Sequence, residues 1–354
     1  MGDSGVTVGT TAESDEVLTR VDNGVGLITL NRPKAINSLN QSMVDALRAV
    51  LARWAGDDAV RAVVLSGAGE RGLCAGGDVV AVYHSARKDG VEARKFWRDE
   101  YALNGQIGRF AKPFVALMDG IVMGGGVGVS AHANTRVVTD TSKVGMPEVG
   151  IGFVPDVGGA YLLARAPGAL GLYAGLTGAP FSGADAIAIG FADHYVPHGE
   201  LEAFAAAIVA DGVDSALAAH AVEPPPSDLV AQRDWIDECF AGDTVEDIVT
   251  ALRARDTGPA NDAADLIASR SPTAVSVALE AVRRAAKLET LEDVLIQDYR
   301  VSSAAAHSHD LVEGIRAQII DKDRNPKWSP ASLAAVSAAD VDAYFTPVAD
   351  DLSF

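Results

Sequence analysis

Met123-Gly124-Gly125-Gly126-Val127-Gly128 is the stretch of sequence that decides the fold, and it lies shortly after the apolar run Phe114–Met118. A short apolar run is typical of a buried strand. A glycine cluster behind such a strand predicts a loop that a ligand or another backbone segment can approach closely. If a helix begins near Gly126, its amide groups add a partial positive charge to this loop.

A second glycine-rich loop follows another apolar run. Arg61–Ser66 is expected to be a buried strand, the loop Gly67–Gly77 follows it, and the motif Cys74–Asp78 (CAGGD) spans the end of this loop. If both loops lie at the same edge of a sheet, they can direct two backbone N–H groups at one oxygen, which would stabilise an oxyanion. The alternative is that the glycines only permit tight turns and close packing, because short motifs of this kind are common.

A third stretch places two carboxylates in apolar, glycine-rich surroundings. Met146–Gly159 (MPEVGIGFVPDVGG) contains Glu148 and Asp156. Burial of a carboxylate is costly and raises its pKa, which suits the group to proton transfer or to the activation of water. The alternative is that both residues cap helices or bond to loop amides.

The remaining sequence predicts an α/β protein with parallel strands and a helical C-terminal region. Val25–Leu30 and Thr135–Thr139 are further expected strands, and Asn40 is the expected N-cap of a helix with an apolar stripe from Met43 to Trp54. We expect a disordered lead-in over 1–16, an α/β core over 17–222 and helices over 223–354, with a proline-rich linker at Glu223–Pro226. The expected C-terminal helices lie at about 228–256, 261–269, 272–288, 290–304 and 310–320.

Composition excludes several classes of function. Lys and Arg number 29 against 48 Asp and Glu, so the net charge of −19 disfavours non-specific binding to nucleic acid or anionic membranes. No apolar run reaches the ~18 residues of a membrane span, and the first residues do not resemble a signal peptide. Cys74 and Cys239 lack disulfide or metal-site spacing, so we expect a cytoplasmic protein without a metal, and Cys74 is expected to be a packing residue.

The three stretches, in this order, resemble the crotonase (enoyl-CoA hydratase/isomerase) superfamily. The resemblance implies a spiral of ββα units followed by helices, an acyl-CoA ligand, and an oxyanion held by the backbone amides of Gly77 and Gly125. Asn31–Asn37 (NRPKAIN) resembles the early segment of the superfamily that contacts CoA. Coenzyme A would be part of the substrate, and no separate cofactor is implied.

Departures from the hydratase pattern indicate one branch of the superfamily. Hydratases carry two catalytic glutamates; the second matches Glu148, whereas the first falls on Gly128. Phe153–Gly159 (FVPDVGG) and Phe96–Asn104 (FWRDEYALN) resemble the 3-hydroxyisobutyryl-CoA hydrolases, as do segments between Tyr299 and Trp328. That resemblance implies a thioester hydrolase of valine degradation.

The same resemblance implies roles for individual residues. Glu148 and Asp156 would be catalytic, and Glu100 would bind the 3-hydroxyl group of the acyl chain. Arg32, Lys34, Lys322 and Lys327 are the candidate contacts of the CoA phosphates, and the alternative for each is a solvated surface charge. Glu148 could attack the thioester to form an anhydride or act as general base on water, and the sequence leaves both routes open.

Two rival functions remain at this point. One is a hydratase or isomerase acting on another acyl-CoA, and the other is a non-catalytic acyl-CoA-binding protein. Release of the CoA thiol separates both from a hydrolase. The oligomeric state is also open, because relatives form homo-oligomers, whereas the long C-terminal helices here could fold back on their own core.

Overall fold

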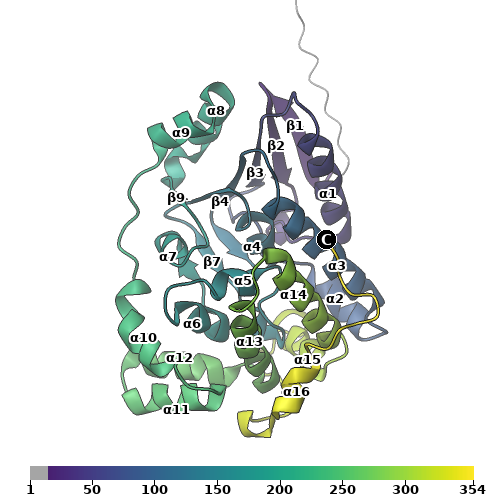
Figure 1. Cartoon of the computed structure of the whole chain (residues 1–354), viewed down its shortest axis with the longest axis vertical. Helices are drawn as coiled ribbons and strands as arrows, with labels where there is room; N and C mark the ends of the chain where they lie inside the picture. The colour runs from purple at the N-terminus through teal and green to yellow at the C-terminus, as the bar shows by residue number, and fades with distance from the viewer. Residues whose placement is uncertain (1–14) are drawn as a thin grey trace, which may run out of the picture.

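The computed structural model describes residues 15–354, and its main sheet has six strands (Figure 1). The first two strands are antiparallel, and the others are added in parallel, as the alternation of strands and helices predicts. In spatial order the strands are β1 (Val17–Asp22), β2 (Val25–Leu30), β3 (Ala62–Gly67), β4 (Phe114–Met118), β6 (Thr135–Val138) and β9 (His194–Tyr195). The expected strands within this set agree with the structure to within one residue, but β1 and the two-residue β9 were not expected. Of the predicted lead-in, residues 1–14 lie outside the described part of the chain.

A smaller second sheet brings the functional segments together. It consists of β5 (Ile121–Met123), β7 (Lys143–Gly145) and β8 (Phe181–Ser182). β5 and β7 are parallel with Met123 opposite Gly145, so the glycine cluster after β5 lies beside the segment that leads to Glu148. A bridge between Cys74 and Val122 holds the loop after β3 along β5 as well. Three segments that are distant in sequence therefore meet at one point.

The two faces of the main sheet pack against different helices. Alternate residues such as Val64, Val115 and Val137 face a small cluster that is covered by α8 (Leu201–Asp211) and α9 (Val213–His220). Ile28, Leu65 and Met118 face the main core on the opposite side. The other helices of the α/β part are α1 (Gln41–Ala55), α2 (Val79–Ala86), α3 (Val91–Gly108), α4 (Gly125–Ser130), α5 (Gly159–Leu163), α6 (Leu170–Thr177) and α7 (Gly183–Ala188).

Local sequence explains how the first helix begins. Asn40 caps α1 through its side-chain oxygen, which accepts a hydrogen bond from the Met43 amide at 3.0 Å. The expected stripe from Met43 to Trp54 is buried against the sheet. Both expectations for this helix are confirmed.

Beyond residue 222 the described chain is helical, as the sequence predicts, but the predicted helix over 228–256 is wrong. It is interrupted after Cys239, and Thr244 starts a new helix by forming a capping box with Asp247. The helices of this region are α10 (Arg233–Cys239), α11 (Val245–Arg255), α12 (Gly258–Ser269), α13 (Pro272–Ala285), α14 (Leu291–Ala305), α15 (His309–Ile315) and α16 (Ala338–Ala343), and a π-helical turn follows α15 at Arg316–Ile320.

The C-terminal helices fold back on the α/β part and share its main hydrophobic core (Figure 1). α14 packs along α3, and α15 packs against α2 and the 3₁₀ turn Glu148–Ile151. The end of the chain returns to α3, where the Asp350 carboxylate pairs with Arg94 and Arg98. None of the helices within residues 15–354 has both the length and the apolar character needed to cross a membrane.

Candidate active site

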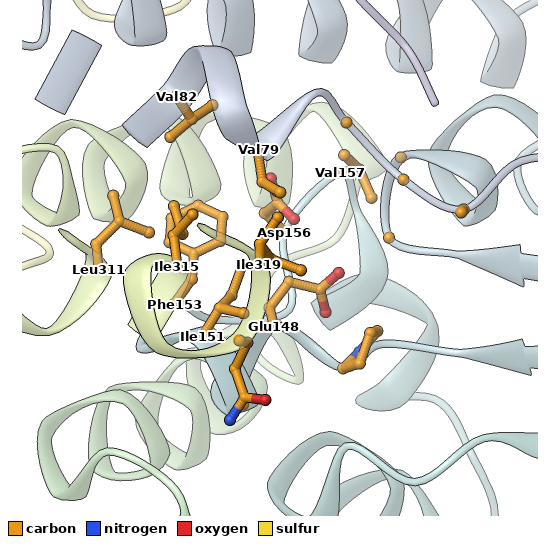
Figure 2. Close-up of a pocket in the computed structure, with 18 of the residues that line it drawn as sticks. Val79, Val82, Glu148, Ile151, Phe153, Asp156, Val157, Leu311, Ile315 and Ile319 are labelled. Carbon is orange, nitrogen blue, oxygen red and sulfur yellow. The ribbon is translucent and has the colours of Figure 1, made fainter. Parts of the chain in front are cut away.

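A cavity of about 360 Å³ lies where the two glycine loops meet the C-terminal helices. One wall is apolar and includes the parallel ring pair of Trp97 and Phe153, whose centroids are 5.2 Å apart. Leu311, Ile315 and Ile319, from α15 and the π turn, close the outer side. Figure 2 shows Phe153, Leu311 and Ile315 grouped to one side of Glu148 and Asp156. This volume and lining are typical of a small-molecule site.

The backbone amides of Gly77 and Gly125 lie at the same side of this cavity. A Cβ atom on Gly125 would be 3.2 Å from the Gly77 nitrogen and 2.6 Å from Oε1 of Glu100, so only glycine fits there. Gly125 is the first residue of α4, where an amide has no acceptor within its own helix. Neither amide donates to an acceptor among the described residues. Both glycines line the cavity, so two backbone N–H groups without an acceptor among the described residues lie at its wall.

Three carboxyl side chains point into the cavity, and all three are buried. Glu100, Glu148 and Asp156 are 2%, 7% and 5% exposed. Burial, followed by repulsion from Asp156, raises the pKa values of Glu100 and Glu148 well above the usual range of a glutamate. Burial likewise raises the pKa of Asp156 to about 7, against a hydrogen bond from Tyr101 that lowers it. A carboxyl with a pKa near 7, as Asp156 has, can exchange a proton near neutral pH.

Two of these carboxyls keep an oxygen ready for a ligand. Oε1 of Glu100 and Oε2 of Glu148 are buried without a hydrogen-bond partner among residues 15–354. Buried polar atoms are normally paired, so each such oxygen points to a missing partner. The cavity therefore presents two N–H donors and two carboxyl oxygens to whatever occupies it.

The turn that carries Asp156 is held from both sides. Val157 and Gly158 have φ values of 52° and 75°, and the first is unfavourable for a β-branched residue. His132 Nε2 donates to the Val157 carbonyl at 2.7 Å, and the Gly158 amide donates to the Asp298 carboxyl at 2.8 Å. These contacts from opposite sides stabilise the turn and direct Asp156 into the cavity.

Gly128 faces a filled space. A Cβ atom there would be 2.7 Å from the Val157 Cβ and 2.8 Å from Nδ2 of Asn104. Asn104 is fully buried, and neither its amide nitrogen nor its amide oxygen has a partner among the described residues. The position at which hydratases carry their first glutamate thus has no room for a side chain.

The candidate CoA-binding cations do not line the cavity. The Arg32 guanidinium forms ion pairs with Glu16 at 3.2 Å and Asp78 at 3.5 Å, and it donates to the Ser38 carbonyl. Lys34 and Lys322 are exposed. Their contacts with CoA stay predictions. Within residues 15–354, Arg270 is the basic residue of the lining, and burial lowers its pKa.

Other side chains weighed from the sequence have structural surroundings. Cys74 is fully buried, and burial raises the pKa of its thiol to about 12, which agrees with a packing role rather than a nucleophile. The described residues contain no cluster of three or more His, Cys, Asp or Glu side chains that could hold a metal ion.

Sequence reasoning missed the residues behind the carboxyls. Tyr101, Asn104, Asp298 and Ser302 are all buried and polar, but none lines the cavity directly. A signal was available, because Trp97, Glu100, Tyr101 and Asn104 share one helical face. Without knowledge that α14 packs on α3, that face could not be assigned to the site.

Comparisons with known proteins agree with this fold. The family model described as enoyl-CoA hydratase/isomerase matches residues 25–345. Relatives named 3-hydroxyisobutyryl-CoA hydrolase, mitochondrial, are 39% identical in Danio rerio (94% of this chain, 89% of the relative) and 36% identical in Homo sapiens (97% and 92%).

Solved structures are similar as well. A carnitinyl-CoA dehydratase from Mycobacterium thermoresistibile is 68% identical with a TM-score of 0.94, over 96% of this chain and 99% of that one. An enoyl-CoA hydratase from Rhodobacter sphaeroides 2.4.1 is 40% identical with a TM-score of 0.91, over 96% and 100%. The predicted crotonase fold with a helical C-terminal region is confirmed, and the chain belongs to the enoyl-CoA hydratase/isomerase family.

Proposed function

We propose that this protein hydrolyses an acyl-CoA thioester, and that 3-hydroxyisobutyryl-CoA, an intermediate of valine degradation, is its substrate. One observation carries the proposal: Glu148 and Asp156 enter the cavity beside two free amides, while Gly128 leaves no room for the first glutamate of a hydratase. The names of the relatives from Danio rerio and Homo sapiens support the same reaction and acyl group.

The amides of Gly77 and Gly125 would form the oxyanion hole. When the thioester carbonyl is attacked, its oxygen gains negative charge, and two fixed N–H donors stabilise that charge more than the neutral carbonyl. The start of α4 at Gly125 adds a partial positive charge in the same direction. Removal of one such donor typically lowers kcat by ~10²–10³.

Glu148 would act on the thioester carbonyl carbon. Oε1 of Glu148 would be 2.7 Å from a Cβ on Gly124, so the carboxyl lies beside the glycine that precedes the Gly125 amide. Two reaction routes are chemically possible for Glu148.

In the first route, the Glu148 carboxylate attacks the thioester carbonyl, CoA leaves as a thiolate, and water cleaves the resulting anhydride. In the other, Glu148 takes a proton from the water that attacks the carbonyl. In the anhydride route Asp156 would orient the water and accept its proton, and in the general-base route Asp156 would orient the water while Glu148 accepts the proton.

Labelled water distinguishes the two routes. A single turnover in ¹⁸O water by the anhydride route, with attack of water at the glutamyl carbonyl, places ¹⁸O in the Glu148 side chain. The general-base route leaves that side chain unlabelled. Mass spectrometry of the peptide that contains Glu148 reads the difference.

Glu100 would select the acyl group. Its unpartnered Oε1 lies next to Gly125, within the cavity and beside the expected position of the thioester. A carboxyl there can bond to a hydroxyl group on the third carbon of the acyl chain, and an acyl chain without this hydroxyl would leave the carboxyl unpaired. We therefore expect 3-hydroxyacyl thioesters to be preferred over unsubstituted ones.

A hydratase or dehydratase is the second candidate. It is favoured by the 68% identity to the protein from Mycobacterium thermoresistibile, whose name is carnitinyl-CoA dehydratase. Addition or removal of water across a double bond needs proton transfer at the second and third carbons, for which Glu148 and Asp156 could also serve. The lack of room at Gly128 argues against the two-glutamate form of that reaction.

Thiol release from purified protein decides between the candidates. The substrates are 3-hydroxyisobutyryl-CoA, 3-hydroxypropionyl-CoA, crotonyl-CoA and carnitinyl-CoA, and the enoyl absorbance is followed in parallel. Rapid thiol release from the two hydroxyacyl thioesters, with unchanged crotonyl absorbance, supports the hydrolase. A change in enoyl absorbance without thiol release contradicts it, and tight binding without either signal indicates the non-catalytic alternative.

Location and assembly remain proposals. The composition and two unpaired, buried cysteines support a cytoplasmic location, whereas the relatives named above are mitochondrial. No cofactor other than the CoA of the substrate is proposed. A homo-oligomer also stays a prediction. The lining residues of the cavity come from this chain and do not test the prediction.

A further inference from the structure

Behind Asp156 lies a chain of hydroxyl groups that lines no part of the cavity. The Tyr101 hydroxyl is 2.6 Å from Oδ2 of Asp156 and 2.6 Å from Oγ of Ser302. Tyr101 and Ser302 are both fully buried. The two hydroxyls come from different helices, α3 and α14, and they meet only because these helices pack side by side (Figure 1).

The direction of these hydrogen bonds follows from the number of protons. An ionised carboxylate can only accept, so the Tyr101 O–H donates to Asp156. A phenol carries one proton, and Ser302 must therefore donate to the Tyr101 oxygen. Both O–H groups point towards Asp156, and a donor that itself accepts a hydrogen bond is strengthened.

The surroundings of Asp156 otherwise oppose its ionisation. Among residues 15–354, no Lys or Arg lowers the pKa of Asp156. The neighbouring buried carboxyls Glu100, Glu148 and Asp298 are acidic like Asp156. The Tyr101 hydrogen bond is the side-chain contact that favours the charged form. The other titratable groups around this carboxyl are Glu100 from α3, Glu148 from the 3₁₀ turn, Asp298 from α14, His132 after α4, and Arg270 across the cavity.

We propose that Tyr101, supported by Ser302, is a positioning residue that favours the ionised form of Asp156 and holds this carboxylate towards the cavity, where it orients the water and, in the anhydride route, accepts its proton. The role given to Asp156 in the reaction rests on the hydrolase function proposed above. The hydrogen-bond chain itself does not, so it can be tested without substrate.

Infrared titration of the carboxyl groups provides that substrate-free test. The C=O band of protonated Asp156 is assigned by its loss in Asp156→Asn, and its midpoint is compared in wild type and Tyr101→Phe. Loss of the donor destabilises the carboxylate, so the pKa of Asp156 rises. We expect the midpoint to move up by about one pH unit or more. An unchanged midpoint overturns the proposal.

The matched control is Tyr299→Phe. Tyr299 is equally buried and lies one turn before Ser302, but its hydroxyl contacts Arg98 and Asp350, away from Asp156. We expect this variant to leave the midpoint unchanged, and an equal shift would contradict the proposal. Ser302→Ala should move the midpoint in the same direction by a smaller amount. If Tyr101→Phe does not fold, the Ser302→Ala variant is used for the test instead. An unchanged midpoint in Ser302→Ala then overturns the proposal.

Kinetics tests the link to the reaction. A one-unit rise of this pKa lowers the ionised fraction about tenfold at pH values below both midpoints and leaves it unchanged well above them. In Tyr101→Phe, kcat/KM for the hydroxyacyl thioester should therefore fall about tenfold at acidic pH and recover at alkaline pH. A loss that is equal at every pH would indicate only structural damage. If the wild-type protein releases no thiol, the proposed hydrolase function is contradicted, whereas the infrared result still tests the effect of Tyr101 on Asp156.

Discussion

Four polar groups at the cavity have no hydrogen-bond partner within the described part of the chain. They are the amides of Gly77 and Gly125 and one carboxyl oxygen each of Glu100 and Glu148. A buried polar group without a partner costs about 1–3 kcal/mol. The fold tolerates this cost only because the surrounding core is extensive and rigid. Such a concentration of unpaired groups is expected where a ligand completes the hydrogen bonds, and it predicts opposite effects of substitution on activity and on stability.

Glu148→Gln is the first residue-scale prediction. The amide cannot act as nucleophile or base, so turnover should fall by ~10²–10⁴. The same change removes a carboxyl that burial and Asp156 disfavour in the charged form, so the melting temperature at pH 8 should rise by about 2 °C or more. Steady-state kinetics and calorimetry measure the two effects. Near-normal turnover would exclude Glu148 from the centre of the mechanism.

At the scale of elements, two helices decide which chemistry the cavity can support. α3 places Glu100, Tyr101 and Asn104 on one inward face, and α4 places Gly128 opposite Asn104. Because Asn104 and Val157 fill the space beside Gly128, the loss of the first hydratase glutamate is part of the packing. Restoration of that glutamate alone should not restore a hydratase.

Gly128→Glu tests this packing argument. The new side chain would clash with Val157 and Asn104, so the melting temperature should fall by several degrees, at about 2–4 °C per kcal/mol. No hydration of crotonyl-CoA should appear. Gly199→Glu is the matched control, since a Cβ there meets nothing within 4 Å and the residue lies just before the start of α8, where an acidic residue is favourable. Hydration by Gly128→Glu without loss of stability would contradict the argument.

At the scale of the whole molecule, the C-terminal helices complete the cavity within one chain. Leu311, Ile315 and Ile319 close a space whose other walls come from the α/β part. The lining residues of the cavity within the described part of the chain thus come from both its α/β part and its C-terminal helices. The continuous main core, which extends from Val17 to Leu352, holds the two parts together.

Activity per chain should accordingly be independent of dilution. We expect the same specific activity across a concentration range in which light scattering shows any oligomer to dissociate. A drop that follows dissociation would indicate that a second copy contributes to the site.

The buried carboxyls also make stability depend on pH. Their pKa values are raised in the folded protein, so between the unfolded value near 4 and the folded value of about 7 for Asp156 the native state binds more protons. Stability should therefore fall as pH rises through this window. Chemical denaturation at pH 5, 6, 7 and 8 measures the trend, and Asp156→Asn should flatten it. An increase in stability over this range would contradict the assignment.

The sequence by itself determined the strands β2, β3, β4 and β6, the N-cap at Asn40, and the three glycine-rich stretches, because these depend on local periodicity and turn chemistry. It also singled out Glu148 and Asp156, since carboxylates in apolar runs are rare. The break in the expected helix over 228–256 is different, because the capping box of Thr244 and Asp247 that starts α11 is a local signal that the sequence analysis overlooked. Only the tertiary structure decided that Tyr101, Asn104, Asp298 and Ser302 lie behind Glu148 and Asp156. The physical reason is that register between β5 and β7 and packing of α14 on α3 join residues far apart in sequence, and no local pattern encodes such contacts.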